Sequence, residues 1–229
     1  MNPALEPSLV RYAPAIAALG DWIAARWAFG SQSTPDAQAP LAEIVVVCTG
    51  NSRRSVLGAA LGNLAALEVG WAGRVRFHSA GTTPTACNPR TLATLERLGA
   101  TVKATGRLAP PGPGGETNPE YSITLRVPDH HTQSKADPNA SVVMIEFSKA
   151  LGDPSLPARD FAAAMVCDEA DAGCPIVPGA ALRVAIPHPD PKAFDGQPDE
   201  AARYDQTRDD LGRLMRAVIA HAQTRLARE

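Results

Sequence analysis

Hydrophobic and polar positions divide the chain into alternating strand-like and helix-like segments. The β-branched run over 43–47 has the length of a buried strand, and a helical pattern rich in Ala and Leu follows over 56–69. A second strand is expected over 74–79, and Asn88-Pro89 is a typical helix start, with Asn as the capping residue. This order of elements predicts a parallel α/β sheet whose ligands bind at the carboxyl ends of the strands.

The second half of the chain continues the same pattern. Further strands are expected over 161–166 and 181–187, and an amphipathic helix closes the chain over 198–228. Residues 7–30 add one more helical pattern ahead of the first strand. Together these segments predict a parallel four-stranded sheet flanked by helices, with an additional N-terminal helix.

The segment 106–160 interrupts the pattern. It contains a loop rich in Pro and Gly and then two strand-like segments, 121–127 and 142–147, which predict a hairpin inserted into the core fold. We therefore expect an N-terminal helical extension and linker over 1–40, and one α/β domain over 41–229 that contains the insertion.

Composition and charge narrow the class of protein. The 22 Lys and Arg residues nearly balance the 24 Asp and Glu residues, so no surface for nucleic acid or an anionic membrane is indicated. The chain lacks an apolar run of about 18 residues, and Glu6 and Arg11 precede any apolar stretch, so neither a membrane span nor a secretory signal is expected. Four cysteines in 229 residues suggest reactive thiols in a reducing cytoplasm more than a disulfide scaffold.

The turn after the first strand carries the candidate chemistry, with Cys48 at its start and Arg54-Ser55 at its end. Folded around an anion, such a turn points its backbone N–H groups inward, and the following helix adds the positive end of its dipole. Helix N-termini and nearby cations lower a thiol pKa from about 8.5 to about 3.5–7.5, which makes Cys48 a candidate nucleophile. Arg54 can hold two oxygens of a tetrahedral oxyanion, Ser55 can donate to the sulfur, and Asn51 can brace the loop. The predicted oxyanion ligands are Thr49, Gly50, Asn51, Ser52, Arg53, Arg54 and Ser55.

Two more cysteines follow the strand expected over 161–166. That strand delivers Cys167 to the sheet edge where Cys48 lies, and Cys174 follows after a short segment of Asp, Glu, Ala and Gly. The segment permits a fold that brings the two thiols together, although a disulfide requires their Cα atoms to lie within about 7 Å. The alternative is a pair of unrelated thiols beside a turn.

A candidate general acid follows the last strand. Asp190-Pro191 lies on a loop that faces the anion site, where one carboxylic acid can protonate a leaving group and proline fixes the backbone that holds it. Taken alone, the segment is also compatible with an ordinary proline-rich turn.

These motifs together resemble a known family. Cys48 to Ser55 resembles the Cys-x5-Arg-Ser loop of the low-molecular-weight protein tyrosine phosphatases and of their relatives, the thioredoxin-coupled arsenate reductases. The segment from Cys167 through Cys174 and the following Pro-Ile-Val-Pro resembles the redox segment of the arsenate reductases, and Asp190 matches the general acid of the phosphatases. Those families usually carry a second cysteine directly before the arginine. Here the residue is Arg53, so no disulfide between neighbouring loop cysteines can form.

The resemblance implies one of two enzymes with a common first step, in which the Cys48 thiolate attacks an oxyanion, Arg54 stabilises its charge and Asp190 protonates the departing oxygen. In a low-molecular-weight protein tyrosine phosphatase, water then hydrolyses a phosphocysteine. In an arsenate reductase, Cys167 attacks the Cys48–arsenic adduct, arsenite leaves, and Cys174 resolves the resulting disulfide.

We favour the reductase from the sequence because both relay cysteines are present at the family spacing. The phosphatases recognise phosphotyrosine through aromatic residues beside the Asp-Pro, whereas here Lys192 and Ala193 follow, with only Phe194 nearby. The resemblance implies a cytoplasmic enzyme of arsenic detoxification with thioredoxin as external reductant, no tightly bound cofactor and no metal. A third hypothesis is a non-catalytic module that binds phosphate or a phosphoprotein.

Overall fold

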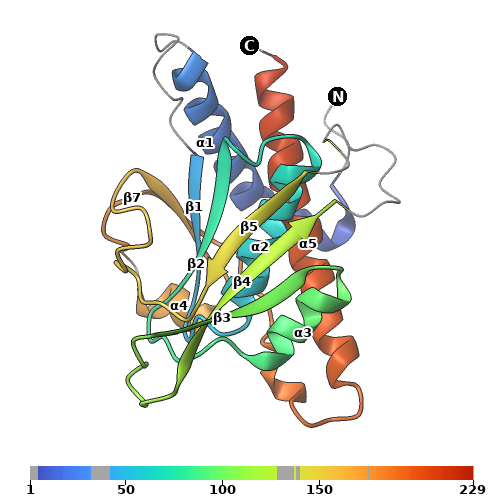
Figure 1. Cartoon of the computed structure of the whole chain (residues 1–229). Helices are drawn as coiled ribbons and strands as arrows, with labels where there is room; N and C mark the ends of the chain where they lie inside the picture. Colours follow the sequence, from blue (N-terminus) through green and yellow to red (C-terminus); the bar gives the residue numbers. More distant parts are fainter. Residues whose placement is uncertain (1–4, 32–41, 128–136, 138–139, 175, 229) are drawn as a thin grey trace.

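The computed structural model describes residues 5–31, 42–127, 137, 140–174 and 176–228 (Figure 1). Its central sheet has four strands in the order β2-β1-β6-β7, and every neighbouring pair is parallel. The expected parallel four-stranded sheet is therefore confirmed. The strands are β1 (Ala42–Cys48), β2 (Val75–Gly81), β6 (Phe161–Met165) and β7 (Ala180–Ala185).

Strand β1 lies inside the sheet, between β2 and β6. Its residues Val45, Val46 and Val47 are fully buried, which explains the uninterrupted β-branched run in the sequence. After β2 the chain crosses β1 to form β6, so the strand order reverses between β1 and β6. In parallel α/β sheets, ligands bind beyond the carboxyl ends of the strands at such a reversal.

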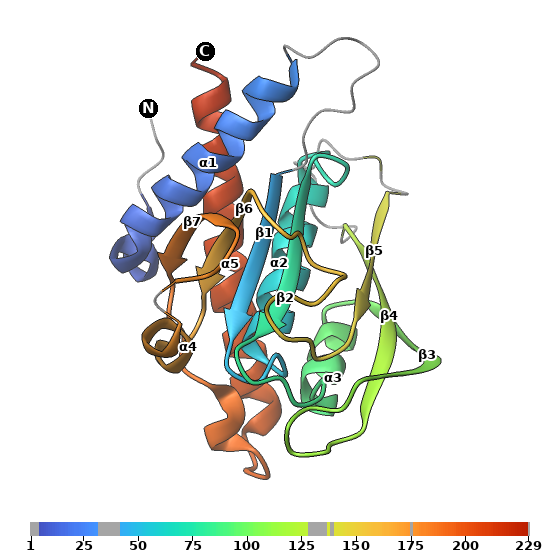
Figure 2. The ribbon, with the colours of Figure 1, turned by 90° about the vertical axis from the view of Figure 1, so that its left-hand side faces the viewer.

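Three long helices lie beside the sheet; the last of them packs against the other two, and those two contact strands of the sheet (Figures 1 and 2). They are α1 (Ala13–Ser31), α2 (Arg54–Glu68) and α5 (Glu200–Leu226). A short 3₁₀ turn, η1 (Pro7–Tyr12), precedes α1. The N-terminal helix predicted from the sequence is thus present, and five apolar residues of this segment lie in the core: Leu9, Tyr12, Ile16, Leu19 and Ile23. Most of the predicted linker lies outside the described residues.

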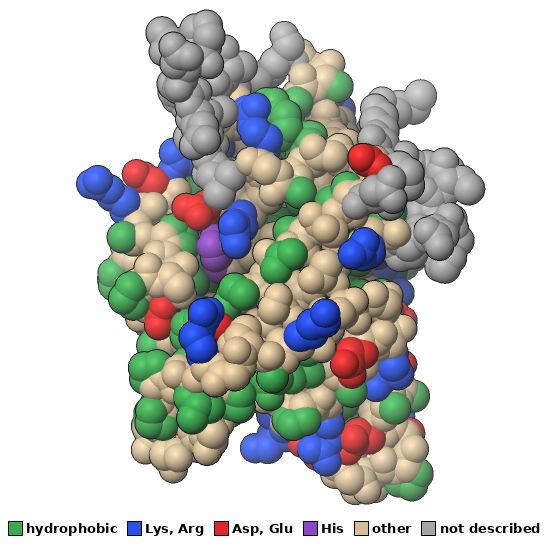
Figure 3. Space-filling model, viewed as in Figure 1, with side chains coloured by type: hydrophobic (Ala, Val, Ile, Leu, Met, Phe, Trp, Pro, Cys, Tyr) green, Lys and Arg blue, Asp and Glu red, His purple; other side chains and the backbone are tan. Residues whose placement is uncertain are grey.

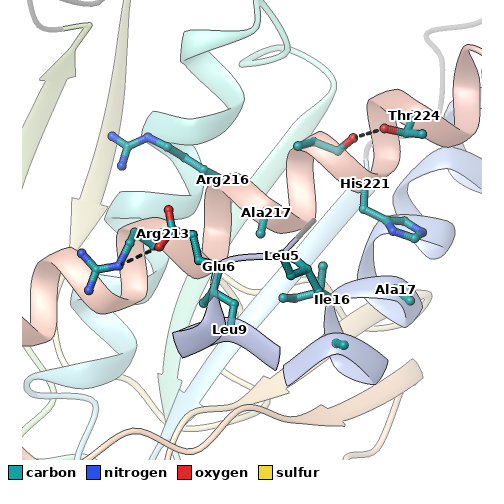
Figure 4. Close-up of a pocket in the computed structure, with 12 residues that line it drawn as sticks. Leu5, Glu6, Leu9, Ile16, Ala17, Arg213, Arg216, Ala217, His221 and Thr224 are labelled. Carbon is teal, nitrogen blue, oxygen red and sulfur yellow. Dashed lines mark hydrogen bonds and ion pairs between the residues drawn. The ribbon is translucent and has the colours of Figure 1, made fainter. Parts of the chain in front are cut away.

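A groove of about 470 Å³ lies between the start of the N-terminal helix and α5 (Figure 4). Leu5, Leu9 and Ile16 give it an apolar wall, and an ion pair of 3.6 Å between Glu6 and Arg213 lies at its rim. No residue of the predicted anion loop lines this groove. It is therefore separate from the candidate site described below.

The insertion forms a second sheet of three antiparallel strands. The expected hairpin is present as β4 (Asn118–Arg126) and β5 (Ser141–Glu146), but a third strand, β3 (Thr101–Ala109), pairs with β4 and begins before residue 106. Ile123, Leu125 and Met144 are buried on the sheet's inner side, where β4 and β5 contact α2. The remaining helix, α3 (Pro89–Arg97), begins as expected, because the Asn88 side chain accepts a hydrogen bond of 2.9 Å from the Arg90 N–H.

The face formed by the second sheet and β2 carries acidic and basic side chains interspersed with one another (Figure 3). This agrees with the nearly balanced charge of the sequence. Within the described part of the chain, every helix is too short or too polar to cross a membrane.

Candidate active site

The loop after β1 is held by the chain segment that follows β2. The carbonyl of Thr49 accepts a hydrogen bond of 2.8 Å from the Thr83 N–H, and that of Gly50 accepts one of 3.1 Å from the Thr85 N–H. In a trans peptide the N–H points opposite to the carbonyl of the same peptide group. Because these two carbonyls point toward the segment after β2, the N–H groups that follow them point away from it, as in an anion cradle. Gly81 permits this close approach, because a Cβ there would lie 2.6 Å from the Thr49 carbonyl oxygen.

Cys48 is the last residue of β1, and its Sγ lies 3.1 Å from the Ser55 hydroxyl. The loop turns at Asn51, whose φ of 42° is in the left-handed region that Asn tolerates. The Asn51 amide donates to the hydroxyls of Ser55 (2.9 Å) and Ser79 (2.7 Å), and its oxygen accepts from the Lys149 N–H (2.7 Å). Asn51 therefore braces the loop, as the sequence suggested, and its side chain is committed to that role.

Arg54 is the first residue of α2, and its side chain is only 8% exposed. Its Nη1 donates to the His188 carbonyl at 3.0 Å, and its Nη2 donates to Asp190 Oδ2 at 2.7 Å. Its Nε is buried and has no hydrogen-bond partner among the described residues. Buried donors are nearly always paired in native proteins, so an anion held in the loop would supply the missing acceptor.

A pocket of about 730 Å³ opens over the loop. Among the described residues, no aromatic side chain lines it. Five of its residues were not predicted as site residues, since they come from the segments after β2 and β6 and after the Asp-Pro, and only the sheet topology brings them to the loop. The lining residues are Cys48, Thr49, Gly50, Ser52, Arg53, Arg54, Thr83, Thr85, Glu169, Asp190, Lys192 and Ala193.

Cys167 lies beside the anion loop. It follows β6 and caps the short helix α4 (Asp168–Gly173), where its Sγ accepts from the Ala170 N–H at 3.4 Å. The same sulfur lies 3.5 Å from the Thr49 hydroxyl. Burial raises the pKa of the Cys167 thiol, while Thr49 and Arg54 act in the opposite direction. The structure thus brings Cys167 to the loop that carries Cys48.

Cys174 stands at the other end of α4 and is half-exposed. Its N–H donates to the Ala170 carbonyl at 3.1 Å, and its thiol donates to the Ile176 carbonyl at 3.2 Å. The thiols of Cys167 and Cys174 are therefore separate, one buried at the loop and one accessible from outside. All four cysteines are free thiols in this structure.

Asp190 reaches the pocket from the loop after β7. It caps a 3₁₀ turn, η2 (Pro191–Phe194), by accepting from the Lys192 N–H at 3.0 Å, and its other carboxylate oxygen binds Arg54. Pro191 fixes the backbone at this point, as the sequence indicated. The structure therefore places the predicted general acid against the predicted oxyanion arginine.

The residues just before Asp190 are supported by the N-terminal segment. The ring of His188 is buried and stacks on Tyr12, with 5.0 Å between the ring centroids and an angle of 9° between the planes. Its Nδ1 lies 2.8 Å from the Ile186 carbonyl oxygen, and the Tyr12 hydroxyl donates to the Pro187 carbonyl at 2.6 Å. The segment η1 thus holds the chain that carries Asp190.

This burial predicts a pH dependence of stability. Burial lowers the pKa of His188, so the unfolded chain takes up a proton at a higher pH than the folded protein. Stability that is present above the unfolded pKa of about 6.5 is therefore lost as the pH falls below it. In urea unfolding at about pH 8 and about pH 5.5, we expect His188→Phe to lose less stability on acidification than the wild type. Equal losses would show that His188 does not contribute.

The guanidinium of Arg53 is engaged by side chains beside the pocket. Arg53 is one of the oxyanion ligands expected from the sequence, but its Nη2 donates to Asp195 and its Nε to the Tyr204 hydroxyl, both at 2.7 Å, so these two donors are already occupied. Arg53 lines the rim of the pocket with its side chain engaged by residues of the C-terminal part of the chain. Asp195 and Tyr204 lie far from Arg53 in the sequence, so the residues around Arg53 do not indicate that these are its partners.

The arrangement suits nucleophilic attack on a tetrahedral oxyanion. A buried thiol lies at the start of an amide-rich loop, a buried arginine has an unpaired donor, and a carboxyl group reaches the same pocket. The described residues include no cluster of His, Cys, Asp or Glu suited to a metal ion.

Comparison with known proteins adds similarities in structure alone, because no family model and no curated protein matches the sequence. A low-molecular-weight phosphotyrosine phosphatase from Vibrio cholerae O395 matches with a TM-score of 0.46 at 14% identity, over 80% of this chain and 98% of that one. A low-molecular-weight protein tyrosine phosphatase from Bacillus subtilis matches with a TM-score of 0.45 at 16% identity, over 80% and 97%. An arginine phosphatase mutant with a phosphorylated active-site serine matches with a TM-score of 0.40 at 15% identity, over 82% and 99%. By themselves these similarities assign neither a family nor an activity to the chain.

Proposed function

We propose that this protein is an arsenate reductase that uses Cys48 as nucleophile and Cys167 and Cys174 as a thiol relay. The observation that carries the proposal is the position of Cys167, whose buried sulfur lies 3.5 Å from the hydroxyl of Thr49, the residue next to Cys48. A second thiol at the nucleophile's loop has no use in ester hydrolysis. It is required when the adduct has to be reduced.

In the first step the Cys48 thiolate attacks arsenic. An S–As bond forms, an As–O bond breaks, and the departing oxygen takes a proton from Asp190 and leaves as water. Arg54 and the loop N–H groups stabilise the charge on the remaining oxygens. The Ser55 hydroxyl lies 3.1 Å from the Cys48 sulfur, where it can donate a hydrogen bond to the thiolate.

In the second step the thiolate of Cys167 attacks the Cys48 sulfur. An S–S bond forms, the electron pair of the S–As bond passes to arsenic, and arsenic is reduced from As(V) to As(III) and leaves as arsenite. Cys174 then attacks the Cys167 sulfur, which frees the Cys48 thiolate and leaves a Cys167–Cys174 disulfide. The half-exposed position of Cys174 suits reduction of that disulfide by an external dithiol protein such as thioredoxin.

Cys167 must lose its proton before it can attack, and its burial opposes this. The relay also requires α4 to rearrange so that the two thiols at its ends can meet, because they are separate in this structure. A helix of six residues is marginal by itself, but Arg183 donates to the carbonyls of Asp171 and Cys174, so the rearrangement has to break these contacts.

The second candidate is a cysteine-dependent phosphatase, which shares Cys48, Arg54 and Asp190 and needs neither relay cysteine. The absence of aromatic side chains among the residues that line the pocket argues against a phosphotyrosine substrate. Phosphate and arsenate have the same charge pattern, so the anion loop itself favours neither enzyme.

The test is arsenate-dependent oxidation of NADPH in the presence of thioredoxin and its reductase, measured with the wild type, Cys167→Ser and Cys174→Ser. We expect wild-type turnover and none in either variant, with hydrolysis of an aryl phosphate retained in all three. A single-turnover assay without thioredoxin separates the steps. Cys174→Ser should release one equivalent of arsenite, because it can still form the Cys48–Cys167 disulfide, whereas Cys167→Ser should release none.

Cys87→Ala is the matched control, since Cys87 is buried and does not line the pocket. It should keep full turnover with arsenate. If arsenate is inert with the wild type while aryl phosphates are hydrolysed by all variants, the relay is wrong and the protein is a phosphatase.

A further inference from the structure

Arg53 belongs to a partly buried cluster on the flank of the anion pocket. Its guanidinium donates to Asp195 and to the Tyr204 hydroxyl, and the Tyr204 hydroxyl donates to the other oxygen of Asp195 at 2.7 Å. The three side chains thus form a closed ring of hydrogen bonds. Tyr204 is 1% exposed and comes from α5, so the ring is fixed to the core.

The carboxylate of this cluster lies at the end of the turn that carries the general acid. Asp190 caps the start of η2, and the Asp195 N–H donates to the Lys192 carbonyl at 3.0 Å at its end. Two consecutive arginines of the anion loop therefore hold the two ends of one short turn. Arg54 binds Asp190, and Arg53 binds Asp195.

The two contacts respond differently when an anion enters the pocket. Nη1 of Arg54 is committed to the His188 carbonyl, so an oxyanion that pairs with the unpaired Nε also approaches Nη2, the atom that binds Asp190. Asp190 must also carry a proton to act as an acid, which removes the charge that binds it to Arg54. The contact between Arg53 and Asp195 does not involve the donors that hold the oxyanion and does not require a protonated carboxyl group. It therefore persists through the reaction.

The ionisation of the cluster fits this role. Burial acts to raise the pKa of Asp195, but hydrogen bonds from Tyr204 and Arg53 hold it below the ordinary value of an aspartic acid. Burial and the neighbouring carboxylate raise the pKa of Tyr204 to about 12. Asp195 therefore stays ionised and Tyr204 stays protonated at neutral pH.

We propose that Arg53 is a positioning residue, which holds the turn 190–195 by its far end and keeps Asp190 over the leaving oxygen when Arg54 releases it to bind the oxyanion. The proposal rests on the first chemical step of the proposed function, which a reductase and a phosphatase share. It does not depend on the thiol relay.

The test compares two aryl phosphates that differ in their need for an acid. Phenol has a pKa of about 10, so its departure as phenolate requires protonation, whereas the more acidic 4-nitrophenol leaves readily without it. The quantity measured is kcat/KM, which covers the steps up to the departure of the alcohol. We expect Arg53→Met to lower kcat/KM for phenyl phosphate by about a hundredfold and to change that for 4-nitrophenyl phosphate little. The ratio between the substrates cancels any loss of anion affinity.

Three further variants make the test specific. Arg90→Met is the matched control, since Arg90 lies 3.7 Å from Asp195 on the other side and does not line the pocket, and it should leave the ratio unchanged. Arg53→Lys keeps the positive charge, so its ratio of kcat/KM between the two esters should lie closer to that of the wild type than the ratio of Arg53→Met does. In an Asp190→Asn background, Arg53→Met should not lower kcat/KM for phenyl phosphate any further, because the acid that Arg53 positions is gone.

Several outcomes would overturn the proposal. Equal losses with both esters would indicate a structural role, and so would a further loss in the Asp190→Asn background. If Arg53→Met fails to fold, Asp195→Asn tests the same contact from the other side and should give the same change in ratio. If the wild type hydrolyses neither ester, there is no acid-catalysed step for Arg53 to support, and the proposal is wrong. Ester hydrolysis without arsenate turnover would overturn the reductase but leave this proposal intact.

Discussion

Replacement of Cys48 by serine is expected to abolish turnover of arsenate and of aryl phosphates alike, by about 10⁴-fold or more. The serine hydroxyl has no adjacent general base in this site and cannot be ionised as a thiol can, so neither adduct forms. Steady-state turnover of both substrates, with the thermal unfolding temperature as a check on folding, measures the effect.

Anion binding should survive the same substitution. The ligands that the structure offers are the loop N–H groups and the Arg54 guanidinium, whose Nε has no partner among the described residues, and Cys48→Ser changes none of them. Titration with inorganic phosphate, followed by calorimetry, should give similar affinities for wild type and variant. The combination of lost turnover and retained binding identifies Cys48 as the nucleophile.

The same experiment decides between the enzymes and the non-catalytic module. If the wild type binds phosphate but turns over neither arsenate nor aryl phosphates, the protein is a binding module and the proposed function is wrong. Cys87→Ala serves as a control here as well. Burial raises the pKa of Cys87 well above its ordinary value, so its thiol stays protonated and its loss should not affect turnover.

Local patterns explain what the sequence could predict. The β-branched run that ends at Cys48, the small polar residues of the turn and the Asn88-Pro89 helix start are each specified within a few neighbours. The parallel order of strands then brings Cys48, Cys167 and Asp190 to one edge of the sheet without further information. The strand β3 gave a weaker signal. Its Val102, Ala104 and Leu108 alternate with polar residues, but most of its side chains are exposed and the small residues Ala104 and Gly106 weaken the pattern.

Long-range polar contacts account for most of what the sequence did not indicate. Arg53 next to Arg54 suggested a second oxyanion ligand, and only the fold shows that its partners are Asp195 and Tyr204. Likewise, nothing in the sequence around Lys149 indicates that its N–H braces Asn51 in the anion loop. Charged residues are buried only where a partner is present, and the partner is supplied by tertiary structure.

The clearest such case is the ion pair that joins the inserted sheet to the loop. The side chains of Glu146 and Lys149 are 1% and 4% exposed, with Lys149 Nζ 2.9 Å from the Glu146 carboxylate. The Ser79 hydroxyl donates to the same carboxylate and accepts from the Asn51 amide, which also donates to Ser55 beside Cys48. The pair therefore lies at the base of the network that fixes the anion loop.

Lys149→Met is accordingly expected to destabilise the protein by about 3–5 kcal/mol, because it leaves the Glu146 carboxylate buried without its cation. Chemical denaturation measures this loss. The double variant Lys149→Met/Glu146→Gln should recover most of it, since a neutral amide can still accept from Ser79 and no charge remains to be buried.

Arg107→Ala provides the comparison on the same sheet. It removes the ion pair between Arg107 and Glu120, in which the arginine is largely exposed, and should change stability far less because water replaces the lost contact. If Lys149→Met cost no more than Arg107→Ala, or if the double variant were no more stable than Lys149→Met, the buried pair would not be what ties the inserted sheet to the loop. If the double variant does recover stability, the inserted sheet supports the site because the buried charge of Glu146 is paired with Lys149.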